Sequence, residues 1–155
     1  MSRGEKRSAA RLAAVQALYE MEMSGKGVVE AVAEFEAHWI GREVDDVEFK
    51  PAEAPFFRDL VAGVVQEQRL VDQKVDTALA KGWPLVRVEA VLRAIMRCGA
   101  FELIRRSDVP ARVVISEYVD VAHAFYDGDE PGMVNAVLDS IGRDVRADEL
   151  SKRVG

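Results

Sequence analysis

The chain has 155 residues and a mass of 17.1 kDa, a size at which one hydrophobic core suffices, so the sequence predicts a single domain over residues 1–155. Hydrophobic residues make up 49% and charged residues 31%, which is typical of a globular protein and excludes a disordered or low-complexity chain. No apolar run approaches the roughly 18 residues of a membrane span, and residues 1–7 lack the apolar stretch of a secretory signal. We therefore expect a soluble, cytoplasmic protein that does not bind membranes.

The apolar residues recur at helical spacing along nearly the whole chain. Helices are expected over 8–23, 28–40, 55–81, 84–106, 110–126 and 131–145. Gln68 interrupts the apolar stripe of the third segment and is expected to mark a bend or a helix boundary. A boundary there would divide the third segment and raise the number of helices from six to seven. No strand-like alternation of useful length is present. The sequence thus predicts an all-α fold, a compact helical globule of six or seven helices.

Glycine, proline and short polar residues mark the ends of these segments. Gly25 suits a left-handed residue after the first helix, and Asp129 is expected to act as the N-cap before Pro131. Residues 41–54 are polar and read as an irregular stretch. The composition of residues 1–7 and 146–155 suggests loose tails.

The residue types that carry catalysis or bind metals are not arranged for either role. Cys98 is the only cysteine and is expected in the core, while the two histidines, His38 and His123, lie too far apart for a one-helix metal motif. Ser116 and Asp120 share a predicted helix with His123, but no strained turn exposes the serine. The sequence therefore predicts a protein that is not an enzyme and uses no cofactor or metal.

The net charge of −6 is unevenly distributed. Residues 1–11 contain four basic residues and one acidic residue, and residues 81–112 contain seven basic residues and three acidic ones. Residues 20–48 hold nine acidic residues against two basic ones. Because screening limits the reach of distant charges, an acidic protein can still bind a polyanion through a basic face.

Arg3, Arg7 and Arg11 recur every four positions and would form one stripe on a helix, with Lys6 beside it and Tyr19 farther along. Such a row can match successive phosphates, and a tyrosine can stack on an unpaired base. Two alternatives remain open: the arginines pair with surface acids, or residues 1–7 form a frayed tail. Arg93 and Arg97 make a second basic pair at the same spacing.

Five runs of sequence carry a family resemblance when they are read together. They are AVQALY at 14–19, FRDLVAGV at 57–64, LRAIMRCGAFEL at 92–103, RSDVP at 106–110 and MVNAVLD at 133–139. In this order and spacing they resemble the NusB family of bacterial antitermination factors. The resemblance implies a non-enzymatic, all-α RNA-binding protein of the cytoplasm. With the ribosomal protein NusE it would bind the single-stranded boxA element of nascent ribosomal RNA transcripts and promote antitermination by RNA polymerase.

The resemblance also implies which residues contact RNA. By position these are Lys6, Arg7, Arg11, Tyr19, Asp129 and Met133, with the alternative for Tyr19 that it serves the face toward the protein partner. Planar guanidinium groups suit phosphate oxygens, so the arginines are assigned to the RNA backbone. Met133 stands where the family usually has an aromatic residue, and Ala136 stands where it has glycine. Methionine lacks an aromatic face, which leaves open whether Met133 covers a base or packs in the core.

The segment matching the family's contact with NusE is 85–97, which gives Glu89, Leu92 and Arg93 as partner-binding residues. Members often have an acid at the position of Leu92, so either Glu89 substitutes for it or the contact is apolar. Asn135 is expected to be a buried amide, Phe57 to pack in the core, and Arg58 to pair with an acid on a neighbouring helix. The sequence leaves open whether the free protein is a monomer or a homodimer.

Three other functions compete with this interpretation. The first is a helical protein-interaction module whose basic patches meet acidic protein surfaces. The second is the RNA-binding front of a ribosomal RNA cytosine methyltransferase, although no cofactor-binding α/β unit follows within the sequence. The third, a helical signalling bundle, accounts for the fold but for none of the five sequence runs.

Overall fold

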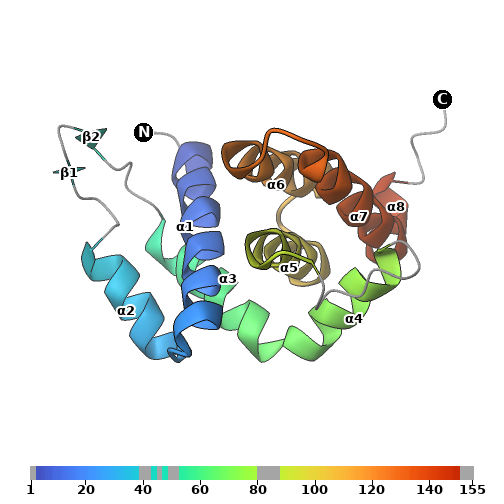
Figure 1. Ribbon diagram of the computed structural model, residues 1–155. Helices are drawn as coiled ribbons and strands as arrows, with labels where there is room; N and C mark the ends of the chain where they lie inside the picture. The colour runs from blue at the N-terminus through green and yellow to red at the C-terminus, as the bar shows by residue number, and fades with distance from the viewer. Residues whose placement is uncertain (1–2, 39–42, 45–46, 49–52, 80–87, 151–155) are drawn as a thin grey trace. The chain divides into compact units, whose positions relative to one another are not determined.

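The computed structural model describes residues 3–38, 43–44, 47–48, 53–79 and 88–150 (Figure 1). These residues form eight α-helices and two strands of two residues each. The elements are α1 (Arg3–Ser24), α2 (Val28–His38), β1 (Glu43–Val44), β2 (Val47–Glu48), α3 (Ala54–Gln66), α4 (Gln68–Ala78), α5 (Ala90–Arg105), α6 (Ala111–Phe125), α7 (Glu130–Val145) and α8 (Ala147–Leu150). The all-α class is confirmed, and the helix count exceeds the expected six or seven.

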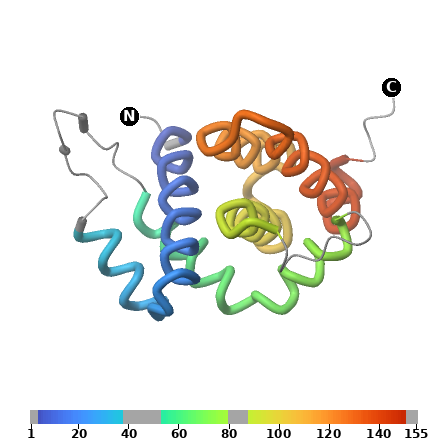
Figure 2. Tube along the Cα trace, in the orientation of Figure 1, coloured from blue at the N-terminus to red at the C-terminus, as the bar shows by residue number. Residues whose placement is uncertain are grey.

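The helices group into two compact units, Met1–Gln66 and Glu67–Gly155. In the first unit, α1 packs against both α2 and α3, and α2 also contacts α3 (Figure 2). Phe57 of α3 is fully buried, as expected, and its ring centre lies 6.1 Å from that of Phe35 of α2. Arg58 donates to Glu36 of α2 at 2.8 Å, which confirms its expected pairing with a neighbouring helix.

The second unit is built around α5, which packs against α4, α6 and α7 (Figure 1). The inward face of α5 includes Ile95 and Met96, both fully buried, and α6 and α7 pack against each other beside it. Tyr118 of α6 is also fully buried and donates its hydroxyl to the buried carboxylate of Glu102 at 2.5 Å. A buried acid with a hydrogen-bond donor avoids the cost of an unsatisfied polar group in the core.

Several boundaries fall where the sequence placed them. Gly25 has φ +76° and donates to the carbonyl of Met21 at 2.9 Å, the left-handed helix end that glycine favours. The expected long third helix is divided at Glu67, whose φ of −101° and ψ of 16° lie outside the helical range. The boundary expected at Gln68 is therefore confirmed and gives the seventh helix; the helix beyond the expected count is α8.

Other expectations about local structure were wrong. Asp129 occupies the N-cap position of α7, but its φ of −83° and ψ of −7° are helical and its side chain makes no capping hydrogen bond. Within the stretch expected to be irregular, β1 and β2 pair in antiparallel register, with Val44 opposite Val47. Residues 80–87, which include the expected end of the third segment and the expected start of the fourth at Pro84, lie outside the described residues.

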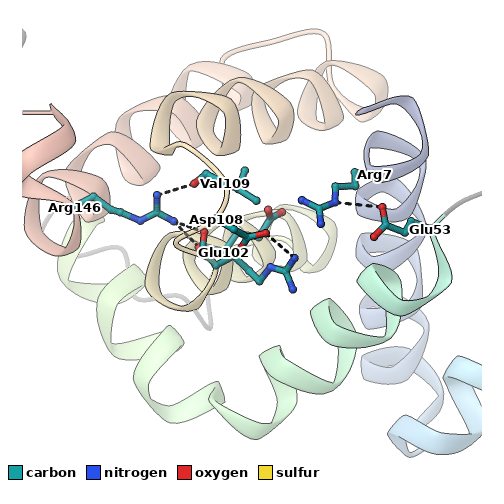
Figure 3. A network of polar contacts seen from close by, with 7 residues as sticks. Arg7, Glu53, Glu102, Asp108, Val109 and Arg146 are labelled. Carbon is teal, nitrogen blue, oxygen red and sulfur yellow. Dashed lines mark hydrogen bonds and ion pairs between the residues drawn. The ribbon is translucent and has the colours of Figure 1, made fainter. Parts of the chain in front are cut away.

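The stretch from Arg146, expected to be a loose tail, is instead folded as far as Leu150. Leu150 of α8 is only 1% exposed. Arg146 donates to four backbone carbonyls, those of Glu102 (3.0 Å), Leu103 (2.9 Å), Arg106 (2.7 Å) and Val109 (2.7 Å). Figure 3 labels two of these residues, Glu102 and Val109, beside Arg146. These carbonyls belong to the last turn of α5 and to the segment leading to α6, where a helix end leaves acceptors exposed and favours a cation.

Glu149 of α8 binds the amino end of α6. Its carboxylate accepts from the backbone N–H of Ala111, the first residue of α6, at 3.1 Å and from Arg146 at 2.8 Å. An acid at the amino end of a helix and a base at the carboxyl end both complement the helix dipole. The Arg146–Glu149 pair therefore caps the end of α5 and the start of α6 together.

We predict that Arg146→Ala lowers the free energy of unfolding by about 3 kcal/mol, because four carbonyls lose a charged donor. Arg143→Ala is the matched control, since Arg143 lies on α7 with a 51% exposed side chain paired to Asp139, and such a surface pair contributes about 0.5 kcal/mol or less. Urea unfolding of both variants measures the difference. Equal losses would show that the carbonyl contacts of Arg146 add nothing.

The hydrogen bond from Arg146, followed by that from the Ala111 N–H, lowers the pKa of the Glu149 carboxyl below its ordinary value of 4.5. A lowered folded-state pKa stabilises the fold above the ordinary pKa, and this contribution is lost as the pH falls through the folded value. We therefore predict that the stability difference between wild type and Glu149→Gln is present at about pH 7 and shrinks below about pH 4. Urea unfolding across this range measures it, and a difference independent of pH would contradict the assignment.

Candidate nucleic-acid interface

The basic residues at the start of α1 gather around one aromatic ring of α3. The guanidinium carbon of Arg7 lies 4.5 Å from the centre of the Phe56 ring, and that of Arg11 lies 5.0 Å from it. The two arginines are one helical turn apart, which places both side chains on the same face of α1. Both contacts are close enough for cation–π attraction.

An acidic residue also contacts this group. Arg7 donates its Nε–H to Glu53, just before α3, at 3.3 Å (Figure 3). The backbone N–H of Glu53 donates to the carbonyl of Lys6 at 3.2 Å, so the entry to α3 is attached to α1 through main chain and side chain. The side chains of Arg7 and Glu53 are 13% and 25% exposed. Arg7 therefore pairs with an acid, which was one of the two alternatives to RNA binding that the sequence left open.

The exposed arginine stripe expected from the sequence is interrupted in the structure. Arg11 is only 2% exposed, because its guanidinium packs on the ring of Phe56. Lys6, Arg7 and Tyr19 are partly exposed. Since α1 begins at Arg3, the alternative of a frayed tail does not hold for the backbone from that residue onward. The side chain of Arg3 lies outside the described residues.

In the second unit, Asp129 and Met133 lie at the start of α7 and both are exposed. Met133 is 37% exposed, which places it at the surface and not in the core. Asn135 is also exposed, so the expectation of a buried amide was wrong. Phe125, the last residue of α6, is 39% exposed. Its spacing continues the apolar stripe of α6, yet at the helix end it keeps this exposed surface.

The three residues expected to bind a protein partner lie in or next to the first turn of α5. Glu89 is exposed and caps this helix by accepting from the N–H of Val91 at 3.4 Å; it also accepts from the hydroxyl of Tyr126. Arg93 is half-buried and donates to the carbonyl of Val88. Leu92 is only 5% exposed, so an apolar contact through this side chain does not fit its position in the core.

The second basic pair does not form an open patch. Arg97 donates to both carboxylate oxygens of Asp72 on α4, at 2.7 and 3.0 Å. A bidentate arginine–carboxylate pair is among the stronger polar contacts in proteins. The bond between α4 and α5 therefore accounts for Arg97 without a nucleic-acid role.

The candidate catalytic and metal-ligating residue types lie as follows in the described part of the chain. Ser116, Asp120 and His123 are all exposed on α6. No group of three histidine, cysteine or acidic residues within the described ranges is placed to hold a metal ion. No helix among these residues has the length and hydropathy to cross a bilayer.

Cys98 is fully buried in α5, and burial raises the pKa of its thiol far above the ordinary value. Only the thiolate is nucleophilic, so we predict that the native protein does not react with a thiol reagent such as 5,5′-dithiobis(2-nitrobenzoate) at neutral pH. In denaturant the same reagent should label one thiol per chain. Rapid labelling of the native protein would show that α5 opens readily or that Cys98 is accessible.

Comparison with known proteins places the chain beside antitermination factors. The model of the NusB family matches residues 8–143. A transcription antitermination protein NusB from Rhodopseudomonas palustris (strain HaA2) is 61% identical over 150 residues, which cover 97% of this chain and 89% of the relative. One from Bradyrhizobium sp. (strain BTAi1 / ATCC BAA-1182) is 58% identical over 151 residues, covering 97% and 89%.

Solved structures share the fold. NusB from T. maritima superposes with a TM-score of 0.76 at 21% identity, covering 97% of this chain and 98% of that one. A second match is a chain in a crystal structure of antitermination factors NusB and NusE in complex with double-stranded RNA. It superposes with a TM-score of 0.73 at 26% identity, covering 93% of this chain and 99% of that one. The chain therefore has the fold of these proteins.

Proposed function

Because this chain belongs to the NusB family, we propose that it is a transcription antitermination factor of the cytoplasm that binds RNA together with the ribosomal protein NusE. The observation that carries the proposal is the family match over residues 8–143, joined to relatives near 60% identity that are antitermination proteins. A structural neighbour binds NusE and RNA at once, which supports a shared complex. The proposed role is assembly and not catalysis.

The RNA proposed for this chain is the single-stranded boxA element of nascent ribosomal RNA transcripts. Tyr19 is partly exposed and Met133 is exposed, and a base can lie against such a side chain only when it is unpaired and unstacked. The exposed carboxylate of Asp129 can accept hydrogen bonds from base amino groups. These contacts read bases, whereas Lys6 and Arg7 of α1 hold the phosphate backbone.

NusE is proposed to bind at the start of α5. Glu89 is exposed there and Arg93 is partly exposed, so this helix end offers an acid and a base within one turn. The Glu89 carboxylate is held by the Val91 N–H and the Tyr126 hydroxyl, which fixes its position before a partner arrives. The complex with RNA polymerase would then form on RNA that the two proteins hold together.

One observation favours a protein-interaction module as the second candidate. Arg7 and Arg97 both bind carboxylates within their own units, at Glu53 and Asp72. Such residues can also bind acidic surfaces of a protein. The two functions differ in whether the chain binds RNA.

Fluorescence anisotropy with a boxA-like single-stranded RNA and a scrambled strand, each with and without NusE, tests the proposed function. Tighter binding to the boxA-like strand, increased by NusE, is the expected result. Binding to neither strand under either condition would favour the protein-interaction module. Equal binding to both strands would leave RNA binding in place and remove the boxA assignment.

We predict that Arg7→Gln weakens binding of the boxA-like RNA and reduces the slope of log affinity against log salt by about 0.7, the value for one phosphate contact on a single strand. Arg58→Gln is the matched control, because it removes the same charge from the same unit at a 50% exposed side chain paired with Glu36. The salt series is measured by anisotropy with the chain and NusE present. Equal slopes for Arg7→Gln and wild type would exclude a phosphate contact at Arg7.

A further inference from the structure

The first unit holds two arginines of α1 against a single aromatic ring, and they are not equivalent. Arg7 has a 13% exposed side chain, while Arg11 is 2% exposed as a whole residue. Their guanidinium carbons lie 4.5 and 5.0 Å from the centre of the Phe56 ring. The charge pattern of the sequence predicts that both arginines contact phosphates, but the two differ in how far they are buried.

Stacking on a ring constrains an arginine without consuming its hydrogen-bond donors. The guanidinium group is planar, and its five N–H groups point outward in that plane. The guanidinium carbon of Arg7 lies 4.5 Å from the ring centre, so cation–π attraction restrains the group without using an N–H donor. Glu53 accepts from the Nε–H of Arg7 at 3.3 Å, which sets the rotation of the group within its plane.

Immobilising a flexible side chain before binding lowers the entropy lost when a ligand arrives. The Phe56 ring and the Glu53 carboxylate both contact Arg7, and the Glu53 N–H bond to the Lys6 carbonyl keeps that carboxylate next to α1. Arg11 packs on the ring that holds Arg7 and is almost fully buried. Arg7 and Arg11 therefore share one ring, and Arg7 is the more exposed of the two.

We propose that Phe56 is a positioning residue for RNA binding: its ring, with Glu53, fixes the Arg7 guanidinium for a phosphate, and Arg11 supports the ring without contacting RNA. The inference rests on the proposed function and narrows its phosphate contacts on α1 to Lys6 and Arg7. It adds two residues of the α3 region, Glu53 and Phe56, that carry no positive charge and that a charge pattern does not indicate.

A double-mutant cycle tests the action of Phe56 through Arg7. Phe56→Leu keeps apolar volume and removes the aromatic face. It should weaken binding of the boxA-like RNA about fivefold in the presence of Arg7, within the range for one immobilised side chain. In the Arg7→Gln background it should weaken binding by less than about twofold, because the group it positions is gone. Equal losses in both backgrounds would overturn the inference.

Phe57→Leu is the matched control for the loss of a buried phenylalanine. Phe57 is the next residue of α3, fully buried, and packs against Phe35 and not on the arginines. Circular dichroism and thermal unfolding should show a loss of stability in both leucine variants, while RNA affinity of the folded protein falls only in Phe56→Leu. Equal losses of affinity would make the effect of Phe56 merely structural.

A second measurement needs no folded Phe56 variant. The Nε–H signals of Arg7 and Arg11 in the wild-type protein are assigned by single Arg→Lys substitutions and followed by NMR during titration with the boxA-like RNA. The Arg7 signal should move and the Arg11 signal should stay in place. A shift of Arg11 equal to that of Arg7, or no shift of Arg7, would overturn the inference.

The outcomes separate this inference from the proposed function. If the wild-type chain binds neither the boxA-like nor the scrambled strand, with or without NusE, the proposed function fails and the inference fails with it. If the wild-type chain binds the boxA-like strand while the cycle shows equal losses, only the positioning role of Phe56 is removed.

Discussion

The contacts of one guanidinium group organise the second unit. Helix ends carry carbonyls that the helix itself cannot pair, and the passage from α5 to α6 gathers several of them in a short space. Arg146 donates to four carbonyls there, and Glu149 binds the first N–H of α6. The end of α5 and the start of α6 are thereby fixed to each other.

Arginines also have a structural role in the first unit, where they contact an aromatic ring as well as a carboxylate. Arg11 is buried on Phe56, and Arg7 lies over the same ring while donating to Glu53. Planarity allows one residue type to pack like an aromatic group and still donate in its plane. The sequence shows a continuous row of basic residues, but packing on Phe56 of α3 buries Arg11 and leaves Arg7 partly exposed.

Much of the fold follows from local rules that a sequence carries. Apolar spacing gave the helical class, Gly25 ended α1 in the left-handed conformation, and the polar Gln68 marked the start of α4. Two of the errors share one cause. Arg146–Leu150 looks polar and short, and Asn135 lies between apolar neighbours; their placement depends on partners distant in the chain. The acceptors of Arg146 lie some forty positions earlier, and no local pattern shows such a pairing.

The sequence by itself determined the helical class, the family and the positions at which RNA and partner contacts are proposed, because periodicity and short motifs are properties of neighbouring residues. Only the tertiary structure decided which of those side chains reach solvent. Arg11 and Leu92 are buried, while Met133 and Phe125 are exposed. The physical reason is that burial depends on which helices pack together, and a side chain's charge or hydropathy does not specify the neighbour that will cover it.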